Sequence, residues 1–185
     1  MKDTYYFSKY FETIEQSLKA IESEQLEQVA SMILETHESG KKIILAGNGG
    51  SAAMASHVAV DLTKAAGIRA INFNEADLIT CFANDYGYEH WIAKAIEFYA
   101  DSGDLVILIS SSGNSKNILN GALQAKSMQL SIVTLSGFSQ DNSLRKLGDH
   151  NLWLCSTSYN IVEMTHHVWL VAIIDYLTEN KKRDD

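Results

Sequence analysis

The stretch "ILAGNGGSAAMASHVAVDL", residues 44–62, decides the fold. An apolar, strand-like run leads into three glycines and Ser51, and a helical pattern follows at once. Four more short apolar runs, "IRAINF", "LVILIS", "LSIVTLS" and "NLWLCS", alternate with segments of helical character. Near-continuous apolar strands separated by helices are typical of a parallel sheet covered on both faces. We therefore expect an α/β fold, a three-layer, doubly wound, five-stranded parallel sheet.

The residues before this core follow a helical pattern instead. Apolar side chains recur every three or four residues in two stripes, the second ending at Gly40, a good residue to follow a helix: Phe7, Tyr10, Phe11, Ile14, Leu18 and Ile21, then Leu26, Val29, Ile33 and Leu34. This predicts an N-terminal helical hairpin over 1–40 and an α/β core over 41–185, with a last helix from about Asn160 to Glu179. A chain of 185 residues suits one domain, 1–185.

Composition excludes several classes of protein. The longest apolar runs, such as "LVILI", are far too short to span a membrane. A formal net charge of −8 with no basic stripe argues against direct contact with nucleic acid or anionic lipid. Cys81 and Cys155 sit among apolar neighbours without metal-ligand spacing, which predicts buried, reduced thiols in a cytoplasmic protein.

Two loops at the ends of predicted strands have the composition of a ligand site. In doubly wound sheets, ligands bind beyond the carboxyl ends of the strands. "AGNGGS" (46–51) and "SSSGNS" (110–115) follow two such ends. Neither is a dinucleotide fingerprint or a P-loop, since Ala52 replaces the required glycine and the P-loop lysine is missing. Close-approaching glycines, helix N-termini and uncharged hydroxyls suit one phosphate monoester. The alternative is that these residues serve only in turns and helix caps.

At these residues the chain resembles the sugar isomerase (SIS) domain family, and within it the single-domain phosphoheptose isomerase group. "GNGGSAAMASH", "ANDYGYE", "ISSSGNSKNIL" and "IVTLSG" occur in the family's order, and the similarity covers nearly the whole chain. The resemblance implies cytoplasmic homotetramers whose N-terminal helices form much of the subunit interface. It also implies conversion of sedoheptulose 7-phosphate into a glycero-manno-heptose 7-phosphate, and zinc binding in some members.

The resemblance also assigns roles to residues. It places the ligand against one set of glycine-loop residues, Asn48, Gly49, Gly50 and Ser51, and the phosphate on the serine loop, through Ser110, Ser111, Ser112 and Ser115. Asn84 and Asp85 match a loop that reaches the sugar hydroxyls, and His57 matches a metal ligand.

The proton-transfer residues depart from the family pattern. Asp61 stands where the family has a glutamate, Val162 replaces a glutamine, and the catalytic histidine falls on Leu170, while Glu163 keeps its match. His57 and Asp61 are four residues apart and share a helix face, as do Glu163 and His167. If the two helices meet, these four residues form a cluster suited to zinc or to acid–base exchange.

Each residue of this cluster has a plainer reading. His166 is an alternative to His167, and any of the four can be an ordinary half-buried or solvated helix residue.

The sequence thus predicts a sugar-phosphate aldose–ketose isomerase with catalytic residues Asp61, His57, Glu163 and His167. The same four are the candidate ligands of one zinc per subunit, and no nucleotide cofactor is expected. The expected partners are a phosphorylated sugar and further copies of the chain. One alternative is a non-catalytic sugar-phosphate-binding or adaptor protein of the replication-initiator-associating type. Another is an isomerase of a different sugar phosphate.

Overall fold

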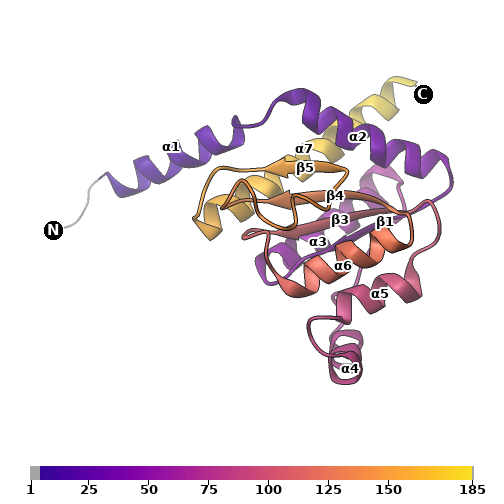
Figure 1. The fold of residues 1–185 in the computed structure, drawn as a ribbon. Helices are drawn as coiled ribbons and strands as arrows, with labels where there is room; N and C mark the ends of the chain where they lie inside the picture. The colour runs from indigo at the N-terminus through magenta and orange to yellow at the C-terminus, as the bar shows by residue number, and fades with distance from the viewer. Residues whose placement is uncertain (1–4, 185) are drawn as a thin grey trace.

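The structure is a computed structural model, and it describes residues 5–184; residues 1–4 and 185, the ends of the predicted domain, lie outside the described part. Five parallel strands form one sheet in the order β2-β1-β3-β4-β5. They are β1 (Ile43–Ala46), β2 (Ala70–Asn72), β3 (Leu105–Ser110), β4 (Ser131–Ser136) and β5 (His150–Trp153). This confirms the predicted doubly wound sheet (Figure 1).

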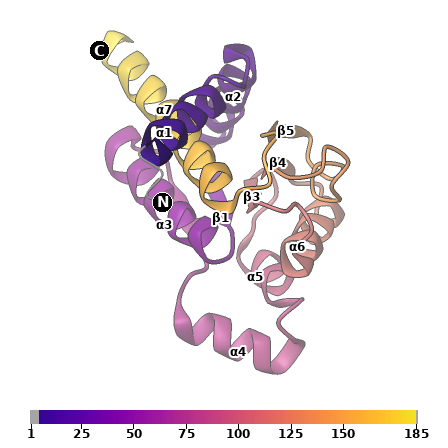
Figure 2. The same cartoon turned by 90° about the vertical axis from the view of Figure 1, so that its left-hand side faces the viewer.

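Helices cover both faces of the sheet and make three layers (Figures 1 and 2). One face is covered by α2 (Ser23–Glu38), α3 (Gly50–Asp61) and α7 (Tyr159–Asp184), and the other by α5 (Trp91–Tyr99) and α6 (Lys116–Ser127). Successive residues of β1 alternate between the two cores, with Ile43 and Leu45 in one and Ile44 and Ala46 in the other. This two-sided burial is why the strands are apolar at nearly every position.

The helix that carries His57 changes its winding at its end. α3 runs to Asp61, and a π-helical turn, η1 (Leu62–Ala66), continues it to Gly67 in the left-handed conformation. Wider π turns occur mostly as single turns within α-helices. Asp61 is therefore the last residue with regular α-helical spacing from His57.

The two predicted N-terminal helices are present, but they do not fold back on each other as a hairpin. α1 (Tyr6–Leu18) projects from the body and points away from α2 (Figure 1). Its C-terminal end packs against α7, where the Trp169 indole N–H donates to the Leu18 carbonyl at 3.0 Å. α2 ends before Gly40, whose φ of +73° fits the predicted helix end. An apolar stripe predicts a helix without fixing what covers the stripe, and here Phe7 and Phe11 stay mostly exposed.

The prediction that both cysteines are buried was wrong. Cys81 and Cys155 are free thiols, as expected, but both are exposed. Cys81 lies on α4 (Ala76–Tyr86), a helix with no fully buried residue that stands off the body in Figure 2, so its apolar neighbours do not enclose it. Over residues 5–184, no helix combines the length and apolar character needed to cross a membrane.

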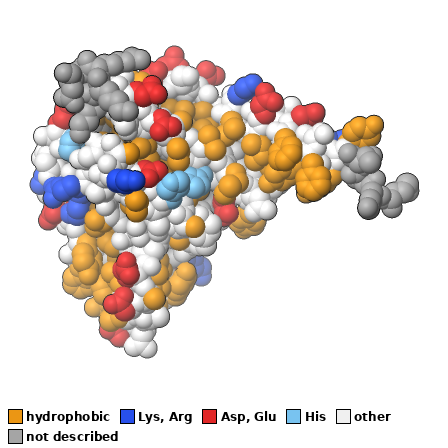
Figure 3. Space-filling model, turned by 180° about the vertical axis from the view of Figure 1, so that it is seen from behind, with side chains coloured by type: hydrophobic (Ala, Val, Ile, Leu, Met, Phe, Trp, Pro, Cys, Tyr) orange, Lys and Arg blue, Asp and Glu red, His pale blue; other side chains and the backbone are white. Residues whose placement is uncertain are grey.

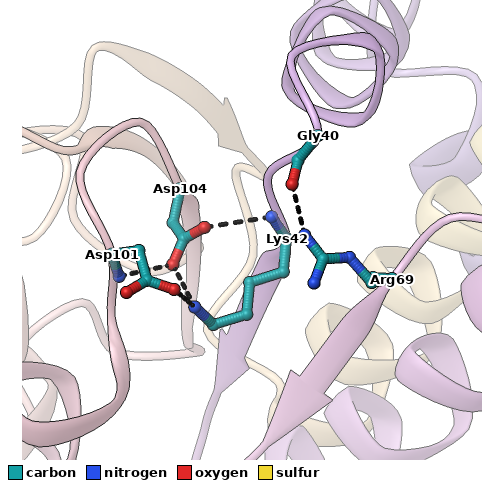
Figure 4. Close-up of polar contacts among 5 residues, drawn as sticks. All are labelled: Gly40, Lys42, Arg69, Asp101 and Asp104. Atoms are coloured by element: carbon teal, nitrogen blue, oxygen red, sulfur yellow. Dashed lines mark hydrogen bonds and ion pairs between the residues drawn. The ribbon is translucent and has the colours of Figure 1, made fainter.

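A buried ion pair fastens the sheet at the end opposite the predicted loops (Figure 4). The Asp104 side chain is 1% exposed, and its carboxylate lies 2.6 Å from Lys42 Nζ. It also accepts the backbone N–H groups of Lys42 at 3.0 Å and Asp101 at 2.7 Å. Burial opposes the charge on Lys42, but hydrogen bonds and attraction from Asp101 and Asp104 outweigh it and raise the lysine's pKa. The interaction joins the starts of β1 and β3.

Replacing Asp104 with alanine is expected to lower the free energy of unfolding by about 3 kcal/mol, because Lys42 loses its buried partner and keeps only the exposed Asp101, while two backbone donors lose their acceptor. Urea denaturation monitored by circular dichroism measures this. The matched variant Asp101→Ala removes a carboxylate that is 74% exposed and should cost much less. Equal losses in the two variants would contradict the importance of burial.

The long C-terminal helix also buries a histidine. His166 is completely buried, and its Nε2 lies 3.1 Å from the Ser136 carbonyl, so the neutral ring donates there. Its Nδ1 has no hydrogen-bond partner among the described residues. Burial lowers the pKa of His166 to about 4, against a weaker opposite effect of the bond to Ser136. The folded protein therefore holds this ring uncharged.

This burial predicts acid sensitivity. An unfolded histidine has a pKa of about 6.5 and takes up a proton below that pH, whereas folded His166 does so only near pH 4. The contribution of neutral His166 to the free energy of unfolding is complete above pH 6.5. It is lost as the pH falls towards 4, and the total loss is about 3 kcal/mol. Urea titrations between pH 7 and 4 measure the slope. His166→Gln, which cannot titrate, should flatten it; an unchanged slope would refute the assignment.

Candidate functional site

The two predicted loops meet through a pair of amides. Asn48, just beyond β1, donates Nδ2–H to Asn117 Oδ1 at 2.9 Å, and Asn117 returns the bond to Asn48 Oδ1 at 2.8 Å. Asn117 is 3% exposed and lies in the first turn of α6. The Tyr88 hydroxyl also approaches Asn48 Oδ1, at 3.3 Å. The Asn48 amide therefore holds the loops together, while the residue still lines the hollow between them.

That hollow has a volume of about 90 Å³, the scale of a small anion. It is lined by Asn48, Ser51, Ile109, Ser110, Ser111, Ser112, Ser115, Tyr159 and Glu163. The Ser110 hydroxyl donates to Ser115 Oγ at 3.1 Å. Ser111 is 5% exposed, and its hydroxyl has no partner among the described residues. A buried hydroxyl without a partner is rare, and here a ligand in the hollow would supply one.

Two helices begin at this hollow, and not all of their first-turn amides are free, because the Ser51 N–H donates to the Asn48 carbonyl at 3.0 Å. Gly49 precedes α3, and Ser115 precedes α6. Within the described residues, no side chain caps either helix. The Ser115 side chain does not cap α6, because its hydroxyl is paired with Ser110. The turn role of the plainer alternative is present, since the Gly113 N–H donates to the Ser110 carbonyl at 2.9 Å. Free N–H groups and the positive ends of two helix dipoles make the hollow attractive to an anion.

A carboxylate stands at the edge of the same hollow. Glu163 comes so close to Gly50 that a Cβ atom on that glycine would lie 2.2 Å from Glu163 Oε2. Gly49, at φ +54° and ψ −121°, turns the chain into α3 in a conformation that side chains resist. The two glycines thus let α3 start directly under Glu163. Ser51 and Glu163, predicted from different parts of the chain, are brought together here.

The other predicted acid–base residues form a hydrogen-bonded chain further along α3. His57 Nε2 lies 3.0 Å from the Asp61 carboxylate, and His57 Nδ1 lies 2.8 Å from His167 Nε2. Burial and the nearby His57 lower the pKa of His167, with Asp61 acting against them. Histidine side chains gather at the middle of the back face, beside acidic and hydrophobic ones (Figure 3). His167, and not the buried His166, therefore faces His57.

The structure brings the four predicted catalytic residues together only in part. His57 lies seven residues beyond Gly50, or about 10 Å along the axis of α3 at 1.5 Å per residue. It lines a separate, mostly apolar hollow of about 330 Å³ with His167 and residues of α7. Glu163 therefore belongs with the serines, while Asp61, His57 and His167 form a neighbouring group.

The arrangement does not fit a bound metal as it stands. Both ring nitrogens of His57 are engaged, one with Asp61 and one with His167. Among residues 5–184, no group of three or more histidine, cysteine or acidic side chains is placed to hold a metal ion. We therefore derive no chemical step through zinc.

Two predicted sugar contacts lie outside the hollow. Asn84 and Asp85 are exposed on α4, where the Asn84 amide donates to the Asp85 carboxylate at 2.9 Å. In the described protomer neither lines the hollow. The residue of "ANDYGYE" that reaches it is Tyr88, through Asn48. Motif matching missed Tyr88 and Asn117; the signal for Asn117 was its place in the first turn after "SGNS".

Comparisons with known proteins show which family the chain is similar to. The profile of the SIS domain matches residues 9–137. Phosphoheptose isomerase of Helicobacter pylori (strain ATCC 700392 / 26695) is 34% identical over 175 residues, which cover 91% of this chain and 90% of that protein. Phosphoheptose isomerase of Campylobacter concisus (strain 13826) is 35% identical over 162 residues, with coverage of 83% and 84%.

A solved structure gives the same result. Phosphoheptose isomerase GmhA from Neisseria gonorrhoeae superposes with a TM-score of 0.85 at 25% identity, covering 93% of this chain and 95% of that one. The profile match, the nearly full-length relatives and the paired glycine and serine loops lead to one conclusion: the chain belongs to the SIS domain family.

Proposed function

We propose that this chain is a phosphoheptose isomerase that converts sedoheptulose 7-phosphate into a glycero-manno-heptose 7-phosphate. The observation that carries the proposal is the pair of uncapped helix N-termini facing one serine-lined hollow. The phosphate would accept hydrogen bonds from the first amides of α3 and α6 and from the serine hydroxyls, including that of Ser111. Relatives that carry the name phosphoheptose isomerase over nearly their full length support the same activity.

The reaction needs a base and a proton donor for two adjacent carbons. With the phosphate at the serine loop, we propose that the far end of the sugar lies between Glu163 and the His57 group, which is linked to α7 through His167. Glu163 is the carboxylate in that hollow, and we assign it the removal of the proton from carbon 1 and its return to carbon 2. His57, oriented by Asp61 and paired with His167, moves the proton between the two oxygens. No net oxidation occurs.

Zinc stays a prediction of the family resemblance. If a metal polarises the carbonyl, the resemblance assigns it to His57, Asp61, Glu163 and His167, and removing it with a chelator abolishes turnover until zinc is restored. If the hydrogen-bonded chain acts alone, turnover survives chelation. The assay is the same one that tests the proposed function.

The alternatives rank below this proposal. An adaptor without catalysis is not favoured, because the relatives at 34% and 35% identity carry an enzyme's name and because Glu163 still faces the serine-lined hollow. An isomerase acting on another sugar phosphate would use the same hollow, and a panel of ketose phosphates separates it from the proposal.

Glu163→Gln should lower kcat by about 10²- to 10⁴-fold while phosphate binds at least as tightly as in the wild type, because it removes the base and a negative charge from the hollow and keeps the shape. Exchange of the carbon 1 proton of sedoheptulose 7-phosphate with deuterated water, followed by NMR, measures this. Glu179→Gln, an exposed position on the same helix, is the matched control. Wild-type protein with no exchange on any ketose phosphate would refute the function, and an active Glu163→Gln variant would refute the role of Glu163.

We further propose that the protein works in the cytoplasm as a homo-oligomer, with a tetramer as the expected form. The support is the projecting α1, whose aromatic side chains Tyr6, Phe7 and Phe11 are 55%, 71% and 65% exposed. Hydrophobic side chains run along this arm in Figure 3. Such a stripe on a helix that leaves the body needs a cover, and further copies of the chain supply one.

Placing charges in this stripe should weaken assembly. The double variant Phe7→Glu/Phe11→Glu is expected to move the protein to a smaller assembly, because two carboxylates would have to be desolvated. Size-exclusion chromatography with light scattering gives the mass. Ser8→Glu/Gln16→Glu, which adds the same charge at exposed positions outside the stripe, should leave the mass unchanged. Wild-type protein that runs as a monomer would overturn the proposal.

A further inference from the structure

Residues 137–144, which follow β4, hold the serine loop through hydrogen bonds. The N–H of Gly137 donates to the Ser111 carbonyl, and the N–H of Leu144 donates to the Gly113 carbonyl, both at 2.9 Å. Further along the loop, the Ser143 N–H donates to Asn114 Oδ1 at 3.3 Å. These bonds tie the ends of β3 and β4 together through the serine loop. The position of the serine loop therefore depends on the conformation of residues 137–144.

One buried amide sets that shape. Asn142 is 3% exposed. Its Nδ2 group lies within hydrogen-bond distance of the Ser136 hydroxyl at 3.0 Å, the Gly137 carbonyl at 3.3 Å and the Ser139 carbonyl at 2.8 Å. Its Oδ1 accepts the Arg145 N–H at 3.0 Å. One side chain thus connects both ends of the turn it belongs to.

The same amide is in direct contact with the serine loop. A Cβ atom on Gly113 would lie 2.0 Å from Asn142 Oδ1 and 2.2 Å from its Cγ. Gly113 has φ of +66°, and its N–H closes the loop on the Ser110 carbonyl at 2.9 Å. The flat amide therefore fills the space that a side chain at 113 would need. The tight turn of 110–113 rests on Asn142.

We propose that Asn142 is a positioning residue for the phosphate site. Its buried amide supports Gly113 and so holds the serine loop in the position in which its hydroxyls and the first amides of α6 can bind a phosphoryl group. It acts through the loop and does not line the hollow. The inference rests on the proposed function for the identity of the ligand. It adds a determinant of affinity that comes from the segment after β4 and not from either loop.

The test uses inorganic phosphate as the probe, because its binding requires no turnover. Asn142→Ala should raise the dissociation constant for phosphate by about tenfold, as expected when one or two net hydrogen bonds that hold the loop are lost. Isothermal titration calorimetry measures it. The neutral substitution avoids adding a charge near the anion. For sedoheptulose 7-phosphate, KM should rise in the same proportion while kcat stays within about threefold.

Asn151→Ala is the matched control. Asn151 is a half-buried amide on β5, where it accepts the Thr134 hydroxyl and lies 3.4 Å from the Gly148 carbonyl, away from the serine loop. It should lower stability yet change phosphate affinity by less than about twofold. Equal affinity losses in both variants, or an Asn142→Ala variant that binds phosphate like wild type, would overturn the inference.

A second measurement works even if Asn142→Ala does not fold. In the wild type, phosphate should slow hydrogen exchange at the amides of Gly137 and Leu144 as well as in 110–115, because the two segments move together. Protection confined to 110–115 would overturn the inference. A wild type that binds phosphate without isomerising sugars would refute the proposed function and leave the role of Asn142 standing.

Discussion

The reciprocal bonds between Asn48 and Asn117 are the interaction on which the site depends. They join the loops after β1 and β3, strands that the sheet places side by side, although the chain separates the two asparagines by 69 positions. Each amide donates once to the other and accepts once from it, so neither can rotate without losing both of these mutual bonds. With the pair in place, the starts of α3 and α6 face a common point. Without it, the sheet would still form, but two anion-binding helix ends would be free to diverge.

The fold and half of the site can be predicted from the sequence, for a physical reason. Strands buried on both faces leave continuous apolar runs, and glycine- or serine-rich turns mark where they enter helices. Contacts across the chain leave no such local trace. Nothing in the residues around Asn142 shows that its amide contacts Gly113, and nothing in α1 shows that it packs against α7 and not against α2. The sequence shows that Asp61 and Leu170 depart from the family pattern. What these departures do to the site depends on where the surrounding side chains point, which the sequence does not show.

The acid–base residues show how far helix periodicity can carry a prediction. Spacing by four correctly paired His57 with Asp61 on one face of α3, and packing of α7 against α3 brought His167 to His57. The same spacing suggested that Glu163 would join them. It lies one turn earlier on α7 and points at the start of α3 instead, because Gly50 leaves room for its carboxylate. A single glycine thus divides the predicted cluster into two groups.

The hollow is lined by hydroxyls, amides and one carboxylate, and none of its described lining residues is a lysine or arginine. An anion there would be neutralised by fixed dipoles, which dissolved ions screen far less than they screen mobile surface charges. At longer range, a protein with a net charge of −8 repels a phosphate dianion. Raising the ionic strength would therefore speed the association of the substrate and change the affinity for its bound phosphate little. In a phosphate site built on lysine, added salt lowers both the association rate and the affinity.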